Sequence, residues 1–297
     1  MSGCLYMVGT PIGNLGDMSP RVAEAFRAAD AICCEDTRVT SKLLAHLGIS
    51  KTLIRCDENV IVQRAPELVD RLLAGEILAF ASDAGMPSVS DPGQVLVDAA
   101  RDAGVEVQVI PGPSACVTAL VASGISCEHF FFEGFLPRKH GERVRRLSEL
   151  ACVPGALLFY ESPHRAAASL QAIARVFPKR RVALCRELTK LHEEVLRDKA
   201  PALLETVLAR GEMRGEMRGE MVIVVAPPAP DEMTGIAVQV DAPDQQELLA
   251  KDIACALEAD EPASAIAKRL SQKYSLRKRE VYARVLAMQE KQNAVAH

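Results

Sequence analysis

Short, mostly apolar runs alternate with longer stretches of helical periodicity through the first third of this chain. The strand-like runs are Leu5–Val8, Ala31–Cys34, Leu53–Cys56, Ile77–Ala81 and Val107–Ile110. Helical patterns lie between them, over Ser41–Gly48, Val60–Ala74 and Gln94–Ala103, and a further one follows Ser19-Pro20. Serine followed by proline is a typical helix start, since serine can cap the first turn and the first turn tolerates proline. The alternation predicts an α/β domain with a mostly parallel sheet.

The same rhythm continues after Ser114. A helix over Ala115–Ser123 is expected to connect two domains. Beyond it, strands are predicted at Phe130–Phe132, Ala156–Tyr160, Arg181–Cys185 and Met221–Val225, with helices at Glu142–Ala151, Arg165–Val176 and Pro201–Arg210. The segment Gly211–Met221 repeats a four-residue unit, which we interpret as a lengthened connection to the last strand. A second α/β domain is therefore predicted.

The end of the chain has a different pattern. Residues 226–245 are rich in Pro, Ala and Asp without helical periodicity, which is typical of a linker. Helical patterns follow at Glu247–Leu257, Ala263–Tyr274 and Leu276–Gln289, and the last two resemble a helix-turn-helix. We predict domains at residues 1–114 and 115–227, a linker at 228–245, and a C-terminal helix-turn-helix-like domain at 246–297.

Composition narrows the function classes. The 297 residues carry a formal net charge of −4 and contain no Trp, so any nucleic-acid contact must come from local basic patches. The nine cysteines are scattered with no C-x-x-C pair, which argues against a structural zinc site and is typical of a reducing cytoplasm. We find no signal-peptide pattern and no apolar run of membrane-spanning length. A cytoplasmic protein with no metal and no membrane contact is expected.

Three strand ends run directly into loops that are rich in turn residues. They are Gly9–Asp17, Ser82–Gly93 and Pro111–Ala115. Loops at the carboxyl ends of parallel strands are where α/β proteins bind small molecules. The glycines match neither G-x-G-x-x-G nor a Walker A loop, but they permit close backbone approach to a ligand. A single loop of this composition needs no ligand to explain it, because Asp, Gly, Pro and Ser are the usual residues of turns. Three in register favour a binding site, in which Asp83 and Asp91 could hold hydroxyls or a cation.

Polar clusters follow the other predicted strands. They are Glu35–Arg38, Glu133–His140, Glu161–Arg165 and Arg186–Glu194. One of them begins a basic patch of Arg138, Lys139, Arg143, Arg145 and Arg146, and a second basic stretch covers residues 268–291. A solvated helical face is the usual meaning of such charge runs. Because the second stretch coincides with the helix-turn-helix pattern, we favour contact with nucleic-acid phosphates.

Eight motifs in order carry a family resemblance: Gly9–Leu15, Glu35–Arg38, Ser82–Pro87, Ser90–Gly93, Pro111–Ala115, Glu133–Lys139, Phe159–Arg165 and Arg186–Lys190. On these motifs the chain closely resembles the rRNA-modifying members of the tetrapyrrole methylase superfamily, the class III S-adenosylmethionine methyltransferases. The resemblance covers essentially the whole chain, and only the repeat around Arg214 and Arg218 departs from it. It implies a two-domain α/β fold with a mostly parallel first sheet, a mixed second sheet and a terminal helix-turn-helix-like domain.

The resemblance also implies an activity and a set of site residues. It implies 2′-O-methylation of a decoding-centre cytidine in 16S rRNA or the small ribosomal subunit, by a homodimer that binds S-adenosylmethionine between its two domains. The cofactor is expected against Pro11, Asp83, Gly85, Met86, Ser114, Ala115, Tyr160, Leu188 and Met221. Lys190, Glu35 and Arg38 are the catalytic candidates, as a base or as a cation for the developing alkoxide. The substrate-binding candidates are Asn14, Asp36, Asp91, Arg138, Lys139, Glu161, His164, Arg165, Arg277, Lys278 and Arg279.

Two alternatives stay open on the residues alone. The same fold could methylate a tetrapyrrole, although a small macrocycle needs neither basic patches nor a helix-turn-helix. The chain could also be a nucleic-acid-binding protein without catalytic activity, in which case it would have no reason to bind S-adenosylmethionine.

Overall fold

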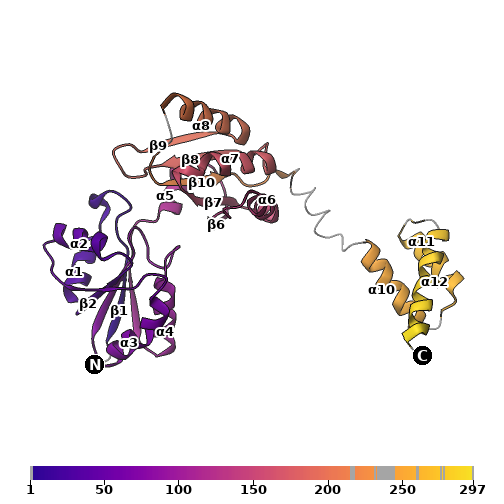
Figure 1. The fold of residues 1–297 in the computed structure, drawn as a ribbon, viewed down its shortest axis with the longest axis horizontal. Helices are drawn as coiled ribbons and strands as arrows, with labels where there is room; N and C mark the ends of the chain where they lie inside the picture. Colours follow the sequence, from indigo (N-terminus) through magenta and orange to yellow (C-terminus); the bar gives the residue numbers. More distant parts are fainter. Residues whose placement is uncertain are drawn as a thin grey trace. The chain divides into compact units, whose positions relative to one another are not determined.

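A computed structural model describes residues 3–214, 218–230, 232, 245–258, 261–274, 276 and 278–295. The chain divides into two compact units, Met1–Ala229 and Pro230–His297. Figure 1 shows two sheets in the first unit and a cluster of helices in the second. The predicted linker, residues 228–245, lies mostly outside the described residues.

The first sheet is entirely parallel. Its strands are β1 (Cys4–Val8), β2 (Ala31–Cys34), β3 (Thr52–Arg55), β4 (Ile77–Ala81) and β5 (Glu106–Ile110). They lie in the order β3-β2-β4-β1-β5, so the three strands that precede the glycine-rich loops are neighbours. The carboxyl ends of neighbouring parallel strands lie along one edge of a sheet, and this brings those loops together. The predicted parallel sheet is confirmed.

Helices cover both faces of this sheet, as Figure 1 shows. They are α1 (Pro20–Ala28), α2 (Thr37–His46), α3 (Ile61–Leu73) and α4 (Gly93–Asp102), with a short 3₁₀ turn, η1, at Leu15–Asp17. On one face Phe26 and Leu44 of α1 and α2 pack against Ile32. On the other face Leu68 and Leu96 of α3 and α4 pack against Phe80 and its neighbours. A parallel sheet needs both faces buried, and these two apolar cores supply that burial.

The second sheet is mixed. Its strands are β6 (Phe130–Phe135), β7 (Ala156–Glu161), β8 (Arg181–Arg186), β9 (Glu194–Lys199) and β10 (Met221–Val225). They lie in the order β6-β7-β10-β8-β9, and only β6 and β7 run parallel. The sequence pattern missed β9, because its residues Glu194–Lys199 are mostly polar. Charged side chains are typical of an edge strand.

Four helices and a short turn complete the first unit. They are α5 (Ala115–Ser123), α6 (His140–Glu149), η2 (Leu150–Cys152), α7 (Pro163–Val176) and α8 (Ala200–Arg214). Helices α6, α7 and α8 pack through Leu147, Leu170 and Leu203 on one face of the second sheet, and α5 packs through Ala119 on the other. Helix α8 extends to Arg214, so the first copy of the repeat is helical. We interpreted all of it as a connection, and for this copy that was wrong.

The second unit consists of helices in the described residues. They are α10 (Gln245–Glu258), α11 (Ala263–Lys273) and α12 (Lys278–Val295). Ile253, Ile266, Leu270 and Val281 form a small apolar core that joins the three helices. None of the helices in the described parts of the chain is both long and apolar enough to cross a membrane.

Candidate functional site

The three loops that follow β1, β4 and β5 are joined through their backbones. Thr10 and Gly85 exchange two hydrogen bonds, of 2.9 and 3.1 Å, which link the loops after β1 and β4. Gly9 lies against Gly112 so closely that a Cβ atom on Gly9 would stand 2.6 Å from the Gly112 nitrogen. The Met86 sulfur accepts a hydrogen bond from the same nitrogen. Glycine is required at this crossing, and the loops form one continuous backbone surface.

A cavity of about 390 Å³ opens above this surface, and we name it cavity 1. Its other wall comes from the ends of β7, β8 and β10. Of the nine residues predicted to hold the cofactor, eight line it: Asp83, Gly85, Met86, Ser114, Ala115, Tyr160, Leu188 and Met221. Phe135 lies beside Tyr160, with ring centroids 5.8 Å apart, and adds a second aromatic side chain to the wall. Small-molecule pockets typically measure about 300–1,000 Å³, and cavity 1 falls within that range.

Cavity 1 is strongly acidic. Five of its lining residues carry carboxylates, and none of the described residues that line it is Lys or Arg: the acidic ones are Glu35, Asp83, Asp91, Glu161 and Glu220. One Asp91 oxygen, Oδ1, accepts from the Gly93 nitrogen at 2.8 Å. The other, Oδ2, is buried and has no hydrogen-bond partner in the described part of the chain. A buried acceptor without a partner is costly, so this oxygen is suited to a ligand that brings a donor or a positive charge.

Glu35 is the most perturbed carboxyl group of this cavity. It follows β2, and its Oε1 accepts from the Asp83 nitrogen at 3.3 Å. Burial, with smaller contributions from the nearby Asp91 and Asp83 carboxylates, raises the pKa of Glu35 to about 7. Burial also raises the pKa of Asp83. A carboxyl group that titrates near neutral pH can accept a proton from a substrate under working conditions.

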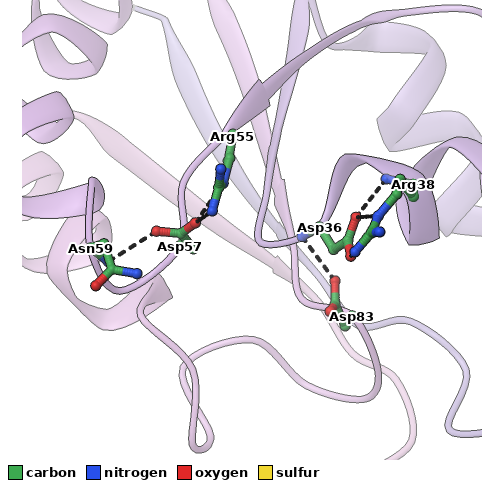
Figure 2. Close-up of polar contacts among 6 residues, drawn as sticks. All are labelled: Asp36, Arg38, Arg55, Asp57, Asn59 and Asp83. Carbon is green, nitrogen blue, oxygen red and sulfur yellow. Dashed lines mark hydrogen bonds and ion pairs between the residues drawn. The ribbon is translucent and has the colours of Figure 1, made fainter.

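Asp36 and Arg38 form a structural pair next to this site. Figure 2 shows the Arg38 guanidinium turned onto the Asp36 carboxylate, 2.6 Å from Oδ2, and the Asp36 nitrogen directed at Asp83. Asp36 also caps α2 by accepting from the Arg38 nitrogen. Hydrogen bonds from Arg38 lower the pKa of Asp36 to about 2. Arg38 lines neither cavity 1 nor the adjoining second cavity described next, so its predicted catalytic role gains no support from the geometry.

A second cavity of about 370 Å³, cavity 2, adjoins the first. The two share Ile12, Ser82, Asp83, Ala84 and Glu220. Pro11, the ninth predicted cofactor residue, lines cavity 2 instead of cavity 1. Asn14, a predicted substrate residue, caps the η1 turn by accepting from the Gly16 nitrogen, and it lines neither cavity.

Lys190 stands in the wall of cavity 2 between two carboxylates. Its Nζ donates to Glu187 at 2.8 Å and to Glu220 at 2.9 Å. Burial lowers the pKa of Lys190, but the hydrogen bonds that its ammonium donates to these two carboxylates outweigh burial and raise the pKa overall. The side chain is therefore an ammonium ion at neutral pH, and in this form it has no lone pair with which to accept a proton. Glu187 lies only three positions from Lys190, but sequence reasoning missed Glu220 as a partner because it lies 30 positions away.

The two loops beside the cavities contain strained backbone. Ser88 and Ser90, in the loop after β4, have φ values of 71° and 65°. Glu187 and Thr189, in the loop after β8, have φ values of 51° and 67°. They are the only residues other than glycine with positive φ in the described chain. Such conformations cost free energy and concentrate at ligand sites.

Some of the polar residues that we predicted as substrate-binding on the second sheet form hydrogen bonds and ion pairs within the protein. Glu161 lines cavity 1, but its carboxylate accepts from Ser169 Oγ and the Ser162 nitrogen. Arg165 lies 3.4 Å from the same carboxylate and donates to the Leu136 carbonyl. His164 is the second residue of α7. These contacts hold β6, β7 and α7 together.

The basic patch around α6 is smaller than its sequence suggests. Arg143 is buried and donates to the carbonyls of Pro137 and Arg138, and Arg146 makes a two-pronged ion pair with Glu133. Arg138 and Lys139 are exposed, with Lys139 paired to Glu142 at 3.1 Å. Only part of the predicted charge is therefore available to phosphates.

Basic residues also mark the start of α12 in the second unit. Lys278 and Arg279 are exposed there, and Arg277 lies outside the described residues. Other cations of the same unit have partners, since Arg269 pairs with Glu261 and Lys273 with Asp252. In helix-turn-helix proteins the start of the second helix contacts nucleic acid.

All nine cysteines are free thiols, and most are buried. Among the described residues no group of three or more His, Cys, Asp or Glu side chains is arranged to hold a metal ion.

Comparison with known proteins places this geometry in a family. A family model described as Tetrapyrrole (Corrin/Porphyrin) Methylases matches residues 4–204. A protein of Streptococcus pyogenes serotype M3 (strain MGAS315) named Ribosomal RNA small subunit methyltransferase I is 38% identical over 284 residues, 95% of this chain and 94% of that protein. A protein of the same name from Xylella fastidiosa (strain Temecula1) is 48% identical over 211 residues, 71% of this chain and 77% of that protein.

Solved structures show the same fold at low identity. The methyltransferase CobJ matches with a TM-score of 0.56 and 21% identity, over 77% of this chain and 95% of that one. Diphthine synthase matches with a TM-score of 0.57 and 14% identity, over 79% and 94%. The sequence relatives and the family model agree with the fold, and this chain belongs to the tetrapyrrole methylase family, among the proteins named ribosomal RNA small subunit methyltransferase I.

Proposed function

We propose that this methyltransferase transfers a methyl group to the ribose 2′-hydroxyl of a decoding-centre cytidine in 16S rRNA. The observation that carries the proposal is the pairing of the two cavities. Cavity 1 is acidic and contains Glu35, whose pKa is raised to about 7, and it shares a wall with cavity 2, which contains lysines. The names of the relatives, which act on small-subunit rRNA, support the choice of substrate. With this substrate we also propose a cytoplasmic location.

S-adenosylmethionine is the methyl donor of this family, and cavity 1 fits it. The donor carries a positive sulfonium and a positive amino group, which an acidic cavity with the unpartnered Asp91 Oδ2 favours. Tyr160, Phe135 and Met221 supply apolar surface for the adenine ring. The first backbone N–H groups of α5, which begins at Ala115, are available for polar contacts, whereas both backbone groups of Gly85 bond to Thr10. When bound, the donor supplies a methyl group on a sulfonium whose leaving group is neutral, so no general acid is required.

The chemistry left to the chain concerns the acceptor. A ribose 2′-hydroxyl is a poor nucleophile, and its proton must leave as the oxygen attacks. Glu35 in its carboxylate form can take this proton, because its pKa of about 7 leaves much of it ionised at neutral pH. The Lys190 ammonium, held between Glu187 and Glu220, can stabilise the negative charge that develops on the oxygen. Holding the hydroxyl in line contributes a further large factor.

We also propose a homodimer. Large apolar side chains are exposed on two successive elements of the first unit, with Val121 of α5 77% exposed and Phe130 of β6 48% exposed. Val117, Phe131 and Phe135 on the same elements are exposed as well. Exposed apolar surface of this kind marks protein contacts. Light scattering should give twice the chain mass, whereas a single-chain mass at micromolar concentration would contradict the dimer.

Mass-spectrometric mapping of 2′-O-methyl groups tests the activity. Small subunits from a strain that lacks this chain are incubated with donor and either the wild-type protein or the Glu35→Gln variant. One new methyl group on a decoding-centre cytidine, seen only with the wild-type protein, is the expected result. A parallel assay with tritium-labelled donor includes uroporphyrinogen as a second acceptor. Labelling of uroporphyrinogen and not of rRNA would show that the protein methylates a tetrapyrrole, which would contradict the proposal.

A further inference from the structure

Cavity 2 has no part in holding the donor in the scheme above, yet it is nearly as large as cavity 1. The two differ in charge. Cavity 1 has no basic residue among its described lining, whereas cavity 2 contains Lys42 and Lys190. Lys190 keeps its charge but is paired with two carboxylates. Lys42 lies exposed on α2 and forms no ion pair within the described residues. An exposed, unpaired ammonium at a cavity rim favours a phosphate over a sulfonium.

The wall of cavity 2 also offers an apolar platform. Leu15 and Val39 line it and are 44% and 39% exposed. They come from different elements, the η1 turn and α2. Apolar side chains left open beside a cation suit a ligand with a flat apolar face and a charged group. A nucleotide has both, since its base can pack on apolar or aromatic side chains while its phosphate contacts a lysine.

Leu191 adds a feature at the next position along the chain after Lys190. Its side chain is 93% exposed, the largest exposed fraction among the large apolar residues described. The loop that carries it is held in shape, because the Thr189 nitrogen donates to Glu193 at 2.6 Å and the Glu193 nitrogen donates to the Lys190 carbonyl. A fixed loop with an exposed leucine resembles the apolar wedges that enter stacks of bases.

We propose that cavity 2 receives the acceptor nucleotide after it has turned out of its base stack, with Lys42 on a phosphate, the base against Leu15 and Val39, and Leu191 in the space the base leaves. This assignment rests on the proposed function and adds the place of the substrate. It also explains the shared wall, because Asp83 and Glu220 border both cavities. A ribose in cavity 2 thus adjoins a donor in cavity 1. Enzymes that act on a single nucleotide commonly extract it in this way.

Filling cavity 2 tests the proposal. Val39→Trp puts an indole into the cavity from a partly exposed position, so the fold should tolerate it, and Leu15→Trp fills it from the other side. Val62→Trp is the matched control, since Val62 is exposed on α3 and lines neither cavity. The measurements use the full chain: donor affinity by calorimetry, and methyl transfer to small subunits at saturating donor. We expect Val39→Trp to lose about 100-fold in methyl transfer while donor affinity changes less than about twofold.

Two milder variants test the contacts. Lys42→Ala should raise the KM for rRNA and reduce the slope of log affinity against log salt by about 0.7–0.9, the value of one phosphate contact. Leu191→Ala should lower kcat about tenfold without changing the unfolding temperature, and Leu191→Phe should restore it. Leu73→Ala, at another exposed leucine, is the control.

The outcomes separate the two proposals. A wild-type protein that binds the donor but never labels rRNA overturns the proposed function. A wild-type protein that labels rRNA, together with full activity in both Val39→Trp and Leu15→Trp, overturns the place of the nucleotide alone. Loss of donor binding in Val39→Trp would also overturn it, because cavity 2 would then belong to the donor site.

Discussion

Cavity 1 and cavity 2 share five residues of wall and differ in nearly everything else. Cavity 1 is built from backbone of three loops and five carboxylates without a lysine or arginine among its described lining, whereas in cavity 2 two lysines accompany the shared Asp83 and Glu220 beside apolar side chains. Charge therefore sorts the two reactants: a cationic donor is favoured on one side and a polyanionic acceptor on the other. The same loops border both cavities. They can therefore serve two ligands of opposite charge, because each loop presents different side chains to cavity 1 and to cavity 2.

The largest expected effect comes from removing Glu35, the proposed base in cavity 1. Glu35→Gln keeps the shape of the side chain but cannot take a proton, so methyl transfer near pH 8 should fall about 10²–10⁴-fold. In the wild-type protein the rate should rise about tenfold between pH 6 and pH 8, because Glu35 ionises through a pKa of about 7. The variant should lack this rise. The measurement is kcat at saturating donor and rRNA across this pH range, with the exposed Glu24→Gln as control.

Stability gives an independent check on Glu35. Its pKa in the folded chain lies above the unfolded value of 4.5, so the folded state favours the protonated form. The contribution of Glu35 to stability is therefore fully present below about pH 4.5 and is lost as the pH rises through about 7. Glu35→Gln should gain thermal stability relative to the wild-type protein at pH 8 and little at pH 4.5. An identical difference at both pH values would contradict the raised pKa.

The next effect concerns the cation at the shared wall. Lys190→Met removes the ammonium that faces the developing negative charge, and methyl transfer should fall about 10²–10³-fold. Because Lys190 stays protonated, the variant should keep the pH dependence that Glu35 imposes. Lys190→Arg should recover part of the rate, since the charge returns with another geometry. Full activity in Lys190→Met with unchanged rRNA affinity would leave cavity 2 without a catalytic cation.

A smaller effect separates binding from catalysis. The double variant Lys278→Ala/Arg279→Ala removes two exposed cations of the second unit and should weaken rRNA binding without lowering kcat. The slope of log affinity against log salt should fall by about 1.4, which corresponds to two phosphate contacts on single-stranded RNA. The control is Arg269→Ala/Lys273→Ala, where both cations already have carboxylate partners. An unchanged slope would point to a folding or dimerisation role.

Local signals in the sequence were enough to predict most of the fold and the three loops whose backbones form one side of cavity 1. Turn residues after Val8, Ala81 and Ile110 locate three loops, and the strand order then brings them together. Other features depend on contacts between distant residues. The ion pair between Lys190 and Glu220 links the loop after β8 to the residue before β10, and no local pattern contains that pairing. Likewise, composition counts Arg143 and Arg146 as a basic patch, whereas burial and Glu133 engage them internally.

The smallest expected effect tests whether the loop beside cavity 2 stores strain. Thr189 is β-branched, has a φ of 67° and buries its Oγ1 with no hydrogen-bond partner in the described residues. This conformation costs a residue other than glycine about 1–2 kcal/mol, and glycine gives back about 0.5–1 kcal/mol through its greater freedom when unfolded. Thr189→Gly should therefore stabilise the first unit by roughly 1 kcal/mol, or about 2–4 °C in calorimetry.

The same change should slow methyl transfer severalfold, because the relaxed loop no longer fixes the neighbouring Lys190. Thr206→Gly is a control of opposite sign, since Thr206 is helical and glycine weakens a helix. If Thr189→Gly lowers the unfolding temperature as Thr206→Gly does, the positive φ carries no stored strain. The two cavities would then differ in charge, and backbone strain in the loop beside cavity 2 would add nothing to that difference.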